Sequence, residues 1–266
     1  MSSLFLLDDL AVLPHDVGDV VELVGDEARH AATVNRMRVG ETTRVGDGRG
    51  TVVTGVVTSV EPKRLTLAVE SVSRIDRPAV RLTLVQALAK GDRDELAVQA
   101  ATELGVDAVV PWQAERSVSR WSGPKVQKGE ERWRSIVREA AKQAIRPWVP
   151  ELRPLVATAD LERLAGETRM LVLEPTATAR LAEWRASDGP GADAGADADA
   201  GDAGVDGLAG VEVTLVVGPE GGLSPAELDR LAAAGATPVR LGAEVLRTST
   251  AGPAAIAALA VALGRW

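Results

Sequence analysis

The pattern of hydrophobic residues along the chain changes near residue 77, and this change restricts the possible folds more than any other feature. Before it, short β-like runs are separated by glycine and aspartate turns, at 20–24, 42–45, 51–60 and 65–69. After it, apolar runs of strand length alternate with segments of helical periodicity. Because Pro78 disfavours a continuous regular element, we expect a hinge there. The sequence therefore predicts two domains, 1–76 and 77–266.

The first domain is expected to be a small β-barrel with a single helix. One helical segment, residues 26–38, interrupts the β-like runs. The domain has a negative overall charge, so any contact with a polyanion has to be local. The candidates for such contacts are Arg29, His30, Arg36, Arg38 and Arg49, and the first four lie in the helical segment.

Alternating strands and helices in the second domain predict an α/β fold with a mostly parallel sheet covered on both faces. The expected strands are at 81–88, 106–111, 170–173, 211–217 and 238–241. One expected helix start, from Asp92 to Glu95, has a capping-box pattern, and another helix is expected to open with Ser224 to Glu227. In sheets of this kind, ligands bind beyond the carboxyl ends of the strands.

Three loops follow expected strands at their carboxyl ends and form the candidate ligand site, at 173–175, 218–222 and 241–250. The middle loop reads G-P-E-G-G, and its glycines let a flat ligand approach the backbone closely. Neither of the common phosphate-binding glycine motifs is present, and Glu220 would repel a phosphate. A cationic, adenine-bearing ligand suits this carboxylate, which points to S-adenosylmethionine. A tight turn with an exposed glutamate is the simpler alternative.

Basic residues are concentrated at 116–146, although the formal net charge of the chain is −8. Nine lysines and arginines stand there against three glutamates. Six aspartates and no basic residue lie in 188–210, which we interpret as a disordered acidic insertion. Arg134, Arg138 and Lys142 recur every fourth residue and are expected to face solvent or phosphate. With tryptophans nearby, this pattern is typical of RNA binding, and also of a solvated charged face.

Composition excludes several kinds of site. The chain has no cysteine, and its two histidines, His15 and His30, are not in a ligand-spaced cluster, so we expect no metal. No apolar stretch approaches the roughly 20 residues of a membrane span. Because the N-terminus also lacks the pattern of a signal peptide, we predict a cytoplasmic protein without membrane contact.

The ordered set of motifs resembles the RsmE family of ribosomal RNA uridine-N3 methyltransferases, within the SPOUT class. The two C-terminal motifs are V-G-P-E-G-G-L-S-P-A-E at 217–227 and L-G-A-E-V-L-R-T-S-T-A at 241–251. Matching segments precede them, at 85–96, 102–106, 115–118, 139–143 and 149–152. Residues 30–40 resemble the PUA-like RNA-binding barrel with which that family begins.

The resemblance implies S-adenosylmethionine-dependent methylation at N3 of a uridine in small-subunit (16S) ribosomal RNA. It also implies a C-terminal trefoil knot and a homodimer formed through the knotted domain. Arg247 would stabilise the negative charge that develops on the uracil oxygens, and Glu220 would shape the methyl-donor pocket. The implied donor-binding residues are Leu173, Glu174, Pro175, Gly218, Pro219, Glu220, Gly221, Gly222, Leu241, Gly242, Val245, Leu246, Thr248 and Ser249. RNA contacts are expected at Arg29, His30, Arg36, Arg38, Arg116, Arg134, Arg138, Lys142, Gln143 and Arg146.

The chain departs from the family pattern at several positions. Members commonly have L-R-T-E-T where this chain has Ser249, and they often have an acid where it has Lys142. For this reason no carboxylate of that motif is assigned as a general base. Two alternative functions stay open: another SPOUT activity, such as ribose 2'-O-methylation of transfer RNA, and a non-catalytic RNA-binding protein.

Overall fold

The structure is a computed structural model, and it describes residues 4–10, 15–185 and 210–266. The chain groups into two compact units. The first consists of Met1–Arg77 and Arg138–Val149, and the second of Pro78–Val137 and Pro150–Trp266. The acidic insertion predicted at 188–210 lies outside the described residues, apart from Gly210.

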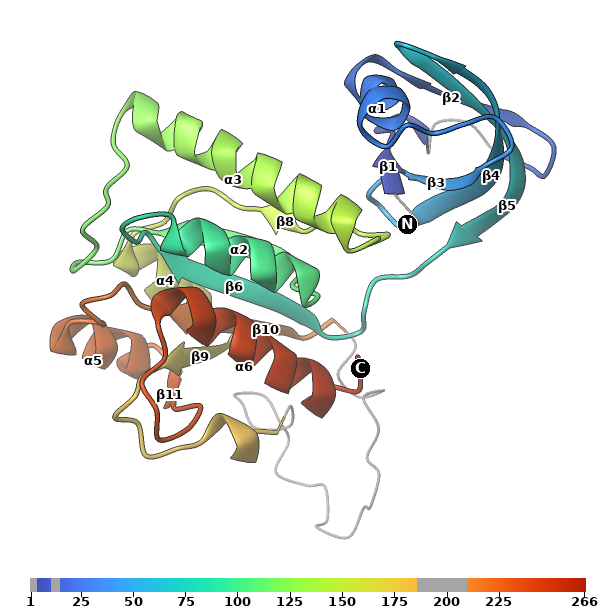
Figure 1. Cartoon of the computed structure of the whole chain (residues 1–266). Coiled ribbons are helices and arrows are strands. Elements are labelled where there is room, and N and C mark those ends of the chain that lie inside the picture. Colours follow the sequence, from blue (N-terminus) through green and yellow to red (C-terminus); the bar gives the residue numbers. More distant parts are fainter. Residues whose placement is uncertain (1–3, 11–14, 186–209) are drawn as a thin grey trace, which may run out of the picture. The chain divides into compact units, whose positions relative to one another are not determined.

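A curled five-stranded sheet forms the body of the first unit (Figure 1). Its order is β1-β3-β4-β5-β2, with bounds β1 (Leu4–Leu6), β2 (Val20–Val24), β3 (Thr42–Gly46), β4 (Thr51–Glu61) and β5 (Arg64–Arg74). All neighbours are antiparallel except β1 and β3, and two register irregularities interrupt the long β4–β5 pair. Such irregularities bend a strand, which helps the sheet to curl around its core. The core includes Phe5, Leu23, Val45, Val53 and Leu67. The barrel-like domain predicted from the sequence is confirmed.

The helical part of the first unit is shorter than the predicted 26–38. A short helix, α1 (Gly25–Arg29), continues into a single π-helical segment, η2 (His30–Val34). Arg36 has a φ of 52°, in the left-handed region, and a right-handed helix does not continue through such a residue. The prediction that the helix reaches residue 38 is therefore wrong.

A later stretch of chain completes the first unit. It comprises the last residues of the long helix α3 (Pro124–Gln143) and the segment that follows this helix. The backbone N–H of Gly50 donates to the carbonyl of Pro147 at 3.0 Å, and Trp148 Nε1 donates to the carbonyl of Ile75 at 2.8 Å. The first unit is thus assembled from two stretches that are distant in sequence.

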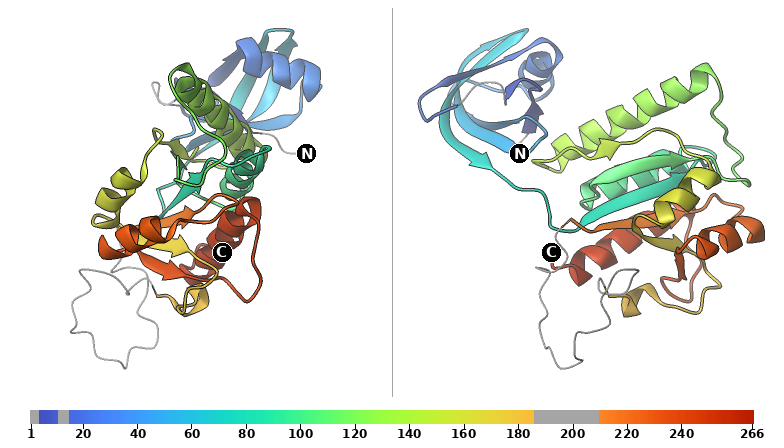
Figure 2. Two further views of the ribbon diagram at one scale, coloured as in Figure 1. Left: turned by 90° about the vertical axis from the view of Figure 1, so that its left-hand side faces the viewer. Right: turned by 180° about the vertical axis from the view of Figure 1, so that it is seen from behind.

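Six parallel strands form the sheet of the second unit, in the order β11-β9-β10-β6-β7-β8. Their bounds are β6 (Arg81–Ala87), β7 (Ala108–Trp112), β8 (Glu151–Leu152), β9 (Arg169–Leu173), β10 (Glu212–Val217) and β11 (Thr237–Val239). The helices on the sheet, besides α3, are α2 (Arg93–Glu103), α4 (Thr158–Ala165), α5 (Pro225–Ala233) and α6 (Thr248–Ala262). Figure 2 shows α2 and α6 on one face and α4 and α5 on the other. The predicted parallel sheet with both faces covered is confirmed.

The helix predicted to open at Ser224 begins with a capping box. Ser224 Oγ accepts from the N–H of Glu227 at 3.1 Å, and Glu227 Oε2 accepts from the N–H of Ser224 at 3.2 Å, at the start of α5. The capping box predicted from Asp92 to Glu95 does not form, because Asp92 is left-handed, with a φ of 59°, and its side chain makes no cap hydrogen bond. Instead, Asp94 Oδ2 accepts from the N–H of Ala89 at 3.0 Å. This bond fixes the loop before α2.

Strands β1 and β8 were not predicted, because runs of three and two residues are too short to show a periodicity.

No helix in the described part of the chain is long and apolar enough to cross a membrane. The threading of a trefoil knot stays a prediction.

Candidate active site

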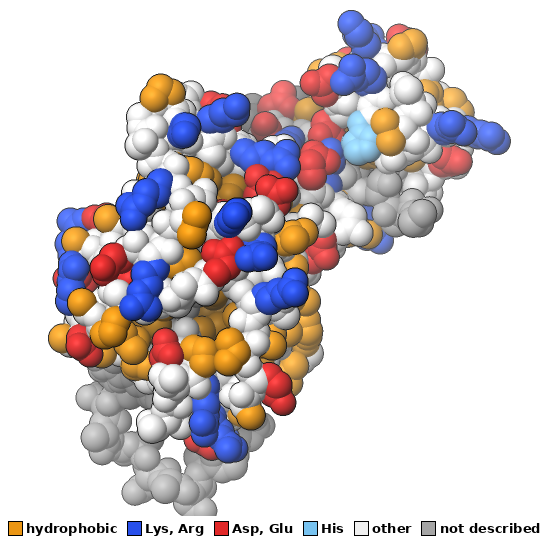
Figure 3. Space-filling model, turned by 60° about the vertical axis from the view of Figure 1, so that its left-hand side comes forward, with side chains coloured by type: hydrophobic (Ala, Val, Ile, Leu, Met, Phe, Trp, Pro, Cys, Tyr) orange, Lys and Arg blue, Asp and Glu red, His pale blue; other side chains and the backbone are white. Residues whose placement is uncertain are grey.

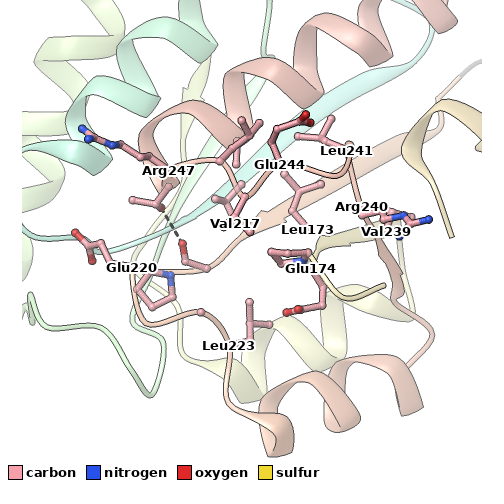
Figure 4. Close-up of a pocket in the computed structure, with 18 of the residues that line it drawn as sticks. Leu173, Glu174, Val217, Glu220, Leu223, Val239, Arg240, Leu241, Glu244 and Arg247 are labelled. Carbon is pink, nitrogen blue, oxygen red and sulfur yellow. Dashed lines mark hydrogen bonds between the residues drawn. The ribbon is translucent and has the colours of Figure 1, made fainter. Parts of the chain in front are cut away.

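The three loops named from the sequence meet at one cavity. Strands β9, β10 and β11 are neighbours in a parallel sheet, so their carboxyl ends lie at one edge. The loop after each strand contributes to the wall of a cavity of about 360 Å³ (Figure 4). The N-terminus of α6 closes it, because Thr248 and Ala251 are also in the lining. The site therefore lies where ligands of parallel α/β sheets usually bind.

Most of the predicted donor-binding residues line this cavity. They are Leu173, Glu174, Pro175, Gly218, Pro219, Glu220, Gly222, Leu241, Gly242, Val245, Leu246 and Thr248. Gly221 and Ser249 are not part of the lining. A Cβ on Gly221 would lie 3.4 Å from the Cβ of Arg116, so this glycine packs against a neighbouring loop. The binding role of all these residues stays a prediction.

Glu220 is held from outside its own loop. Its Oε1 accepts from the backbone N–H of Lys90 at 3.0 Å and from Arg93 Nη1 at 3.0 Å. Burial raises the pKa of Glu220, but the hydrogen bonds from backbone N–H groups and from Arg93 outweigh it, so the pKa lies below its ordinary value. The carboxylate is therefore ionised, and it joins the glycine loop to the segment that precedes α2.

A second anchor holds the loop at its start. Thr248 Oγ1 donates to the carbonyl of Gly218 at 2.8 Å and accepts from Gln86 Nε2 at 2.9 Å, so β6, β10 and α6 are joined at one point. A Cβ on Gly218 would lie 2.6 Å from Leu223 Cδ1, and Gly222 has a φ of 67°. Both positions therefore favour glycine for reasons of the fold alone.

Arg116 forms a third anchor. Its Nη1 donates to the carbonyls of Gly221 and Leu223, both at 3.1 Å. The side chain was predicted from the sequence as an RNA contact, and the structure places it against the glycine loop. Beside it, the N–H of Glu115 donates to Glu227 Oε1 at 2.8 Å. The loop that carries Arg116 is thus bound to the start of α5.

Arg247 lies on the cavity wall immediately before α6. Figure 4 shows it and Glu220 toward the same side of the cavity, with Arg240 on the other side. The Arg247 side chain is exposed, and no hydrogen bond or ion pair joins it to another described residue. It is therefore available to a ligand, as its predicted role requires.

Sequence reasoning missed several lining residues, namely Arg93, Val217, Leu223, Val239, Arg240, Glu244 and Ala251. Val217 and Val239 are the last residues of β10 and β11, so the carboxyl ends of the predicted strands could have indicated them. Arg93 has no such signal, because it comes from a segment about 125 residues before the glycine loop, a separation that no local pattern reveals.

The predicted RNA contacts differ in exposure. Arg29, Arg36, Arg38, Arg116, Arg134 and Gln143 are exposed, whereas His30, Arg138 and Arg146 are half-buried. Arg138 Nη1 pairs with Asp8 Oδ1 at 3.0 Å. On the face of the second unit that Figure 3 shows, basic side chains are scattered among acidic and apolar ones rather than gathered in one patch. Their role in RNA binding stays a prediction.

Lys142 does not face solvent, so the prediction of a solvent-facing row of three basic residues is wrong at this position. The residue is only 6% exposed. Its Nζ pairs with Glu27 Oε1 at 2.8 Å and with Glu139 Oε1 at 3.2 Å. A row with a spacing of four residues turns by about 40° around the helix at each step, which carries its end away from the face on which it began.

Two protein families match the chain. The RNA methyltransferase domain family matches residues 76–260, and the RNA methyltransferase PUA domain family matches residues 23–70. A relative from Mycobacterium bovis, named ribosomal RNA small subunit methyltransferase E, is 41% identical over 273 residues, which is 100% of this chain and 94% of the relative. A relative of the same name from Bacillus subtilis is 29% identical over 239 residues, covering 89% of this chain and 88% of its own.

Solved structures agree with these matches. A ribosomal RNA small subunit methyltransferase E from Neisseria gonorrhoeae, bound to S-adenosyl methionine, superposes with a TM-score of 0.79 at 28% identity, over 98% of both chains. A putative methyltransferase from Legionella pneumophila, in complex with bound SAM, gives a TM-score of 0.79 at 27% identity, also over 98% of both chains. The chain therefore belongs to the RNA methyltransferase family, in the group whose members are named ribosomal RNA small subunit methyltransferase E.

Proposed function

We propose that this protein transfers a methyl group from S-adenosylmethionine to N3 of a uridine in small-subunit ribosomal RNA. The observation that carries the proposal is the cavity built by the three loops at the carboxyl ends of β9, β10 and β11. The names of the relatives and the cofactor of the two solved structures support the same reaction. The assignment to uridine N3 rests on the resemblance to the RsmE family.

The lining of the cavity suits S-adenosylmethionine. Leucine and valine side chains provide apolar walls for an adenine ring, and the glycine loop offers backbone groups to its polar edge. Glu174, Glu220 and Glu244 place carboxylates in the lining beside Arg93, Arg240 and Arg247, so both the cationic groups and the carboxylate of the cofactor can meet a group of opposite charge. When bound, the cofactor supplies a methyl group that its sulfonium has already activated.

The protein's own part is to position the uracil and to stabilise the charge that forms on it. Loss of the N3 proton leaves negative charge on the two neighbouring carbonyl oxygens. Arg247 lies on the cavity wall, exposed and without a partner among the described residues, so its guanidinium is free to donate to those oxygens. Glu220 is engaged by two donors and shapes the loop rather than contacting uracil.

The partner of the active form is proposed to be a second copy of this chain, joined through the C-terminal domain. The loop at the cavity mouth supports this, because it exposes Val245 to 76% and Leu246 to 37%. Burial of such exposed apolar side chains by a partner lowers the free energy of the complex. We further propose a cytoplasmic location, where ribosomal subunits are assembled.

The proposal is tested by calorimetry with S-adenosylmethionine and by mapping of the methylated nucleotide. A methyl group on N3 blocks the pairing edge of uracil, so reverse transcription of treated ribosomal RNA should stop at one uridine. Methylation of a ribose 2'-hydroxyl would indicate the other SPOUT activity. Failure to bind S-adenosylmethionine, together with intact RNA binding, would indicate a non-catalytic RNA-binding protein.

A further inference from the structure

A second cavity lies in the second unit, next to the segment that anchors Glu220. Its volume is about 360 Å³, and its lining includes Lys90, Asp92, Asp94, Ser119, Trp121 and Trp133. None of these residues lines the first cavity, although Arg93, within the same segment, does. The backbone N–H of Lys90 also donates to Glu220. The two cavities therefore share the segment from Lys90 to Asp94 as a common boundary.

Trp121 provides a fixed aromatic surface in this second cavity. Its indole lies against Gly129 of α3, where an added Cβ would be only 2.5–2.6 Å from three ring atoms. It meets Trp133 edge to face, with ring centroids 5.4 Å apart, and its backbone N–H donates to Gln113 Oε1 at 3.0 Å. Trp133 is buried, whereas Trp121 is only half-buried. The Trp121 ring is thus held in place by the fold and remains partly accessible.

The rest of the lining combines apolar, acidic and basic groups. Val118 is 70% exposed and extends the apolar wall beside Trp121. Asp92 and Asp94 supply hydrogen-bond acceptors, and burial raises the pKa of Asp94 even though backbone N–H groups oppose this. Lys90 is exposed and carries a positive charge at the same cavity. Glu95 adds a third carboxylate to the lining. This is the lining expected for a flat aromatic ligand with N–H donors on its edge.

We infer that this cavity is a subsite for one unpaired nucleobase that carries an exocyclic amino group, stacked on Trp121 and close in sequence to the methylated uridine. The inference rests on the proposed function. Unpaired bases of RNA are commonly held by stacking on aromatic side chains. Carboxylates accept hydrogen bonds from base amino groups, so adenine, cytosine or guanine is favoured over uracil.

The test compares protein variants and RNA variants in one methyl-transfer assay on small-subunit ribosomal RNA. Trp121→Ala should raise the KM for RNA roughly 5- to 100-fold. This is the loss of affinity expected when the stacking of a single base is removed. Trp121→Phe should recover most of the loss, because it keeps a stacking surface. Ser119→Leu should act like Trp121→Ala by filling the cavity. The matched control is Trp266→Ala, which removes an indole that is 63% exposed outside this cavity.

The RNA arm replaces each amino-bearing nucleotide that flanks the mapped uridine with uridine. One such replacement should raise the KM of the wild type and have little further effect in Trp121→Ala or Ser119→Leu, because base and cavity act as a pair. The inference would be overturned if every nucleotide replacement raised the KM of Trp121→Ala and Ser119→Leu by the same factor as that of the wild type. It would also be overturned if the KM for RNA of both variants equalled that of the wild type.

Calorimetry with S-adenosylmethionine separates this inference from the proposed function. Both variants should bind the cofactor as the wild type does, and a large loss of binding would show that the second cavity serves the cofactor site instead. If the wild type binds the cofactor but methylates no uridine, the proposed function fails and the inference fails with it. If the wild type methylates and Trp121→Phe behaves like Trp121→Ala, only the stacking subsite is refuted.

Discussion

Arg116 should govern cofactor affinity, although its charge and position first suggested an RNA contact. Arg116→Ala removes two hydrogen bonds to the carbonyls of the glycine loop, at Gly221 and Leu223. A hydrogen bond of this kind contributes about 0.5–1.5 kcal/mol net. Because the side chain is exposed, we expect the lower part of the sum, about 1–2 kcal/mol. Without these bonds the glycine loop is less ordered, and cofactor binding has to order it again. The Kd for S-adenosylmethionine should therefore rise roughly 5- to 30-fold.

The measurement is calorimetry with S-adenosylmethionine in the absence of RNA. Arg120→Ala is the matched control, because Arg120 is a nearby exposed arginine that donates to the carbonyl of Glu115 and not to the glycine loop. Arg116→Lys keeps the charge, but its flexible ammonium is not held in the plane in which Arg116 Nη1 donates to both carbonyls, so it should recover only part of the lost affinity. If cofactor affinity is unchanged and only the KM for RNA rises, Arg116 is an RNA contact and the anchoring argument is wrong.

Three further outcomes are expected. Lys142→Gln should lower the free energy of unfolding in urea by at most about 3 kcal/mol, because it leaves the half-buried Glu27 without its cation, and Glu27→Gln in the same chain should recover much of this loss. The pKa of Glu220 lies below its ordinary value, so its ion pair stabilises the fold above the ordinary glutamate pKa and is lost as the pH falls through the depressed value. The melting temperature of the wild type should accordingly exceed that of Glu220→Gln at neutral pH and converge with it in acid. Arg247→Ala should lower kcat about 10²- to 10³-fold with little change in the Kd for S-adenosylmethionine, measured by single-turnover kinetics and calorimetry; an equal loss of cofactor affinity would contradict its role.

The sequence predicted the second unit well, because buried parallel strands of five to seven residues leave apolar runs that helical segments separate clearly. Strands β6, β7, β9 and β10 were all recognisable in this way. The order of the strands could not be read from the runs themselves. Only that order makes β9, β10 and β11 neighbours, and so brings their loops to one cavity.

Errors arose where tertiary contacts override a local pattern. The capping-box sequence at Asp92 predicts a side-chain cap, but Asp94 is drawn to the N–H of Ala89 and Asp92 takes a left-handed conformation. Lys142 reads as a surface residue because the basic row continues through it. Its burial follows from Glu27, which the folded chain brings within 2.8 Å from more than 100 residues away. Neither partner can be recognised from the sequence that surrounds these residues.

The identity of the group that accepts the N3 proton follows from the state of the carboxylates around the cavity. Glu220 is a poor acceptor, because its pKa is depressed and its Oε1 already receives two hydrogen bonds. Glu174 Oε1 already accepts two hydrogen bonds, from the hydroxyl of Thr176 at 2.8 Å and from its N–H at 3.2 Å, so that oxygen is engaged as well. Arg247 has no lone pair to offer.

Glu244, the third carboxylate of the lining, is exposed to water. We therefore expect the N3 proton to pass to solvent, so that the enzyme uses the small fraction of uracil that is already deprotonated. The single-turnover rate at saturating cofactor should then rise about tenfold per pH unit across the neutral range, without levelling off above the pKa of a carboxylate. Glu220→Gln and Glu174→Gln should change the single-turnover rate by the same factor at every pH, so that its dependence on pH keeps the same slope. A plateau that disappears in Glu174→Gln or Glu244→Gln would identify that glutamate as the base and refute the argument, because only a titrating protein group sets a limit that its own substitution removes.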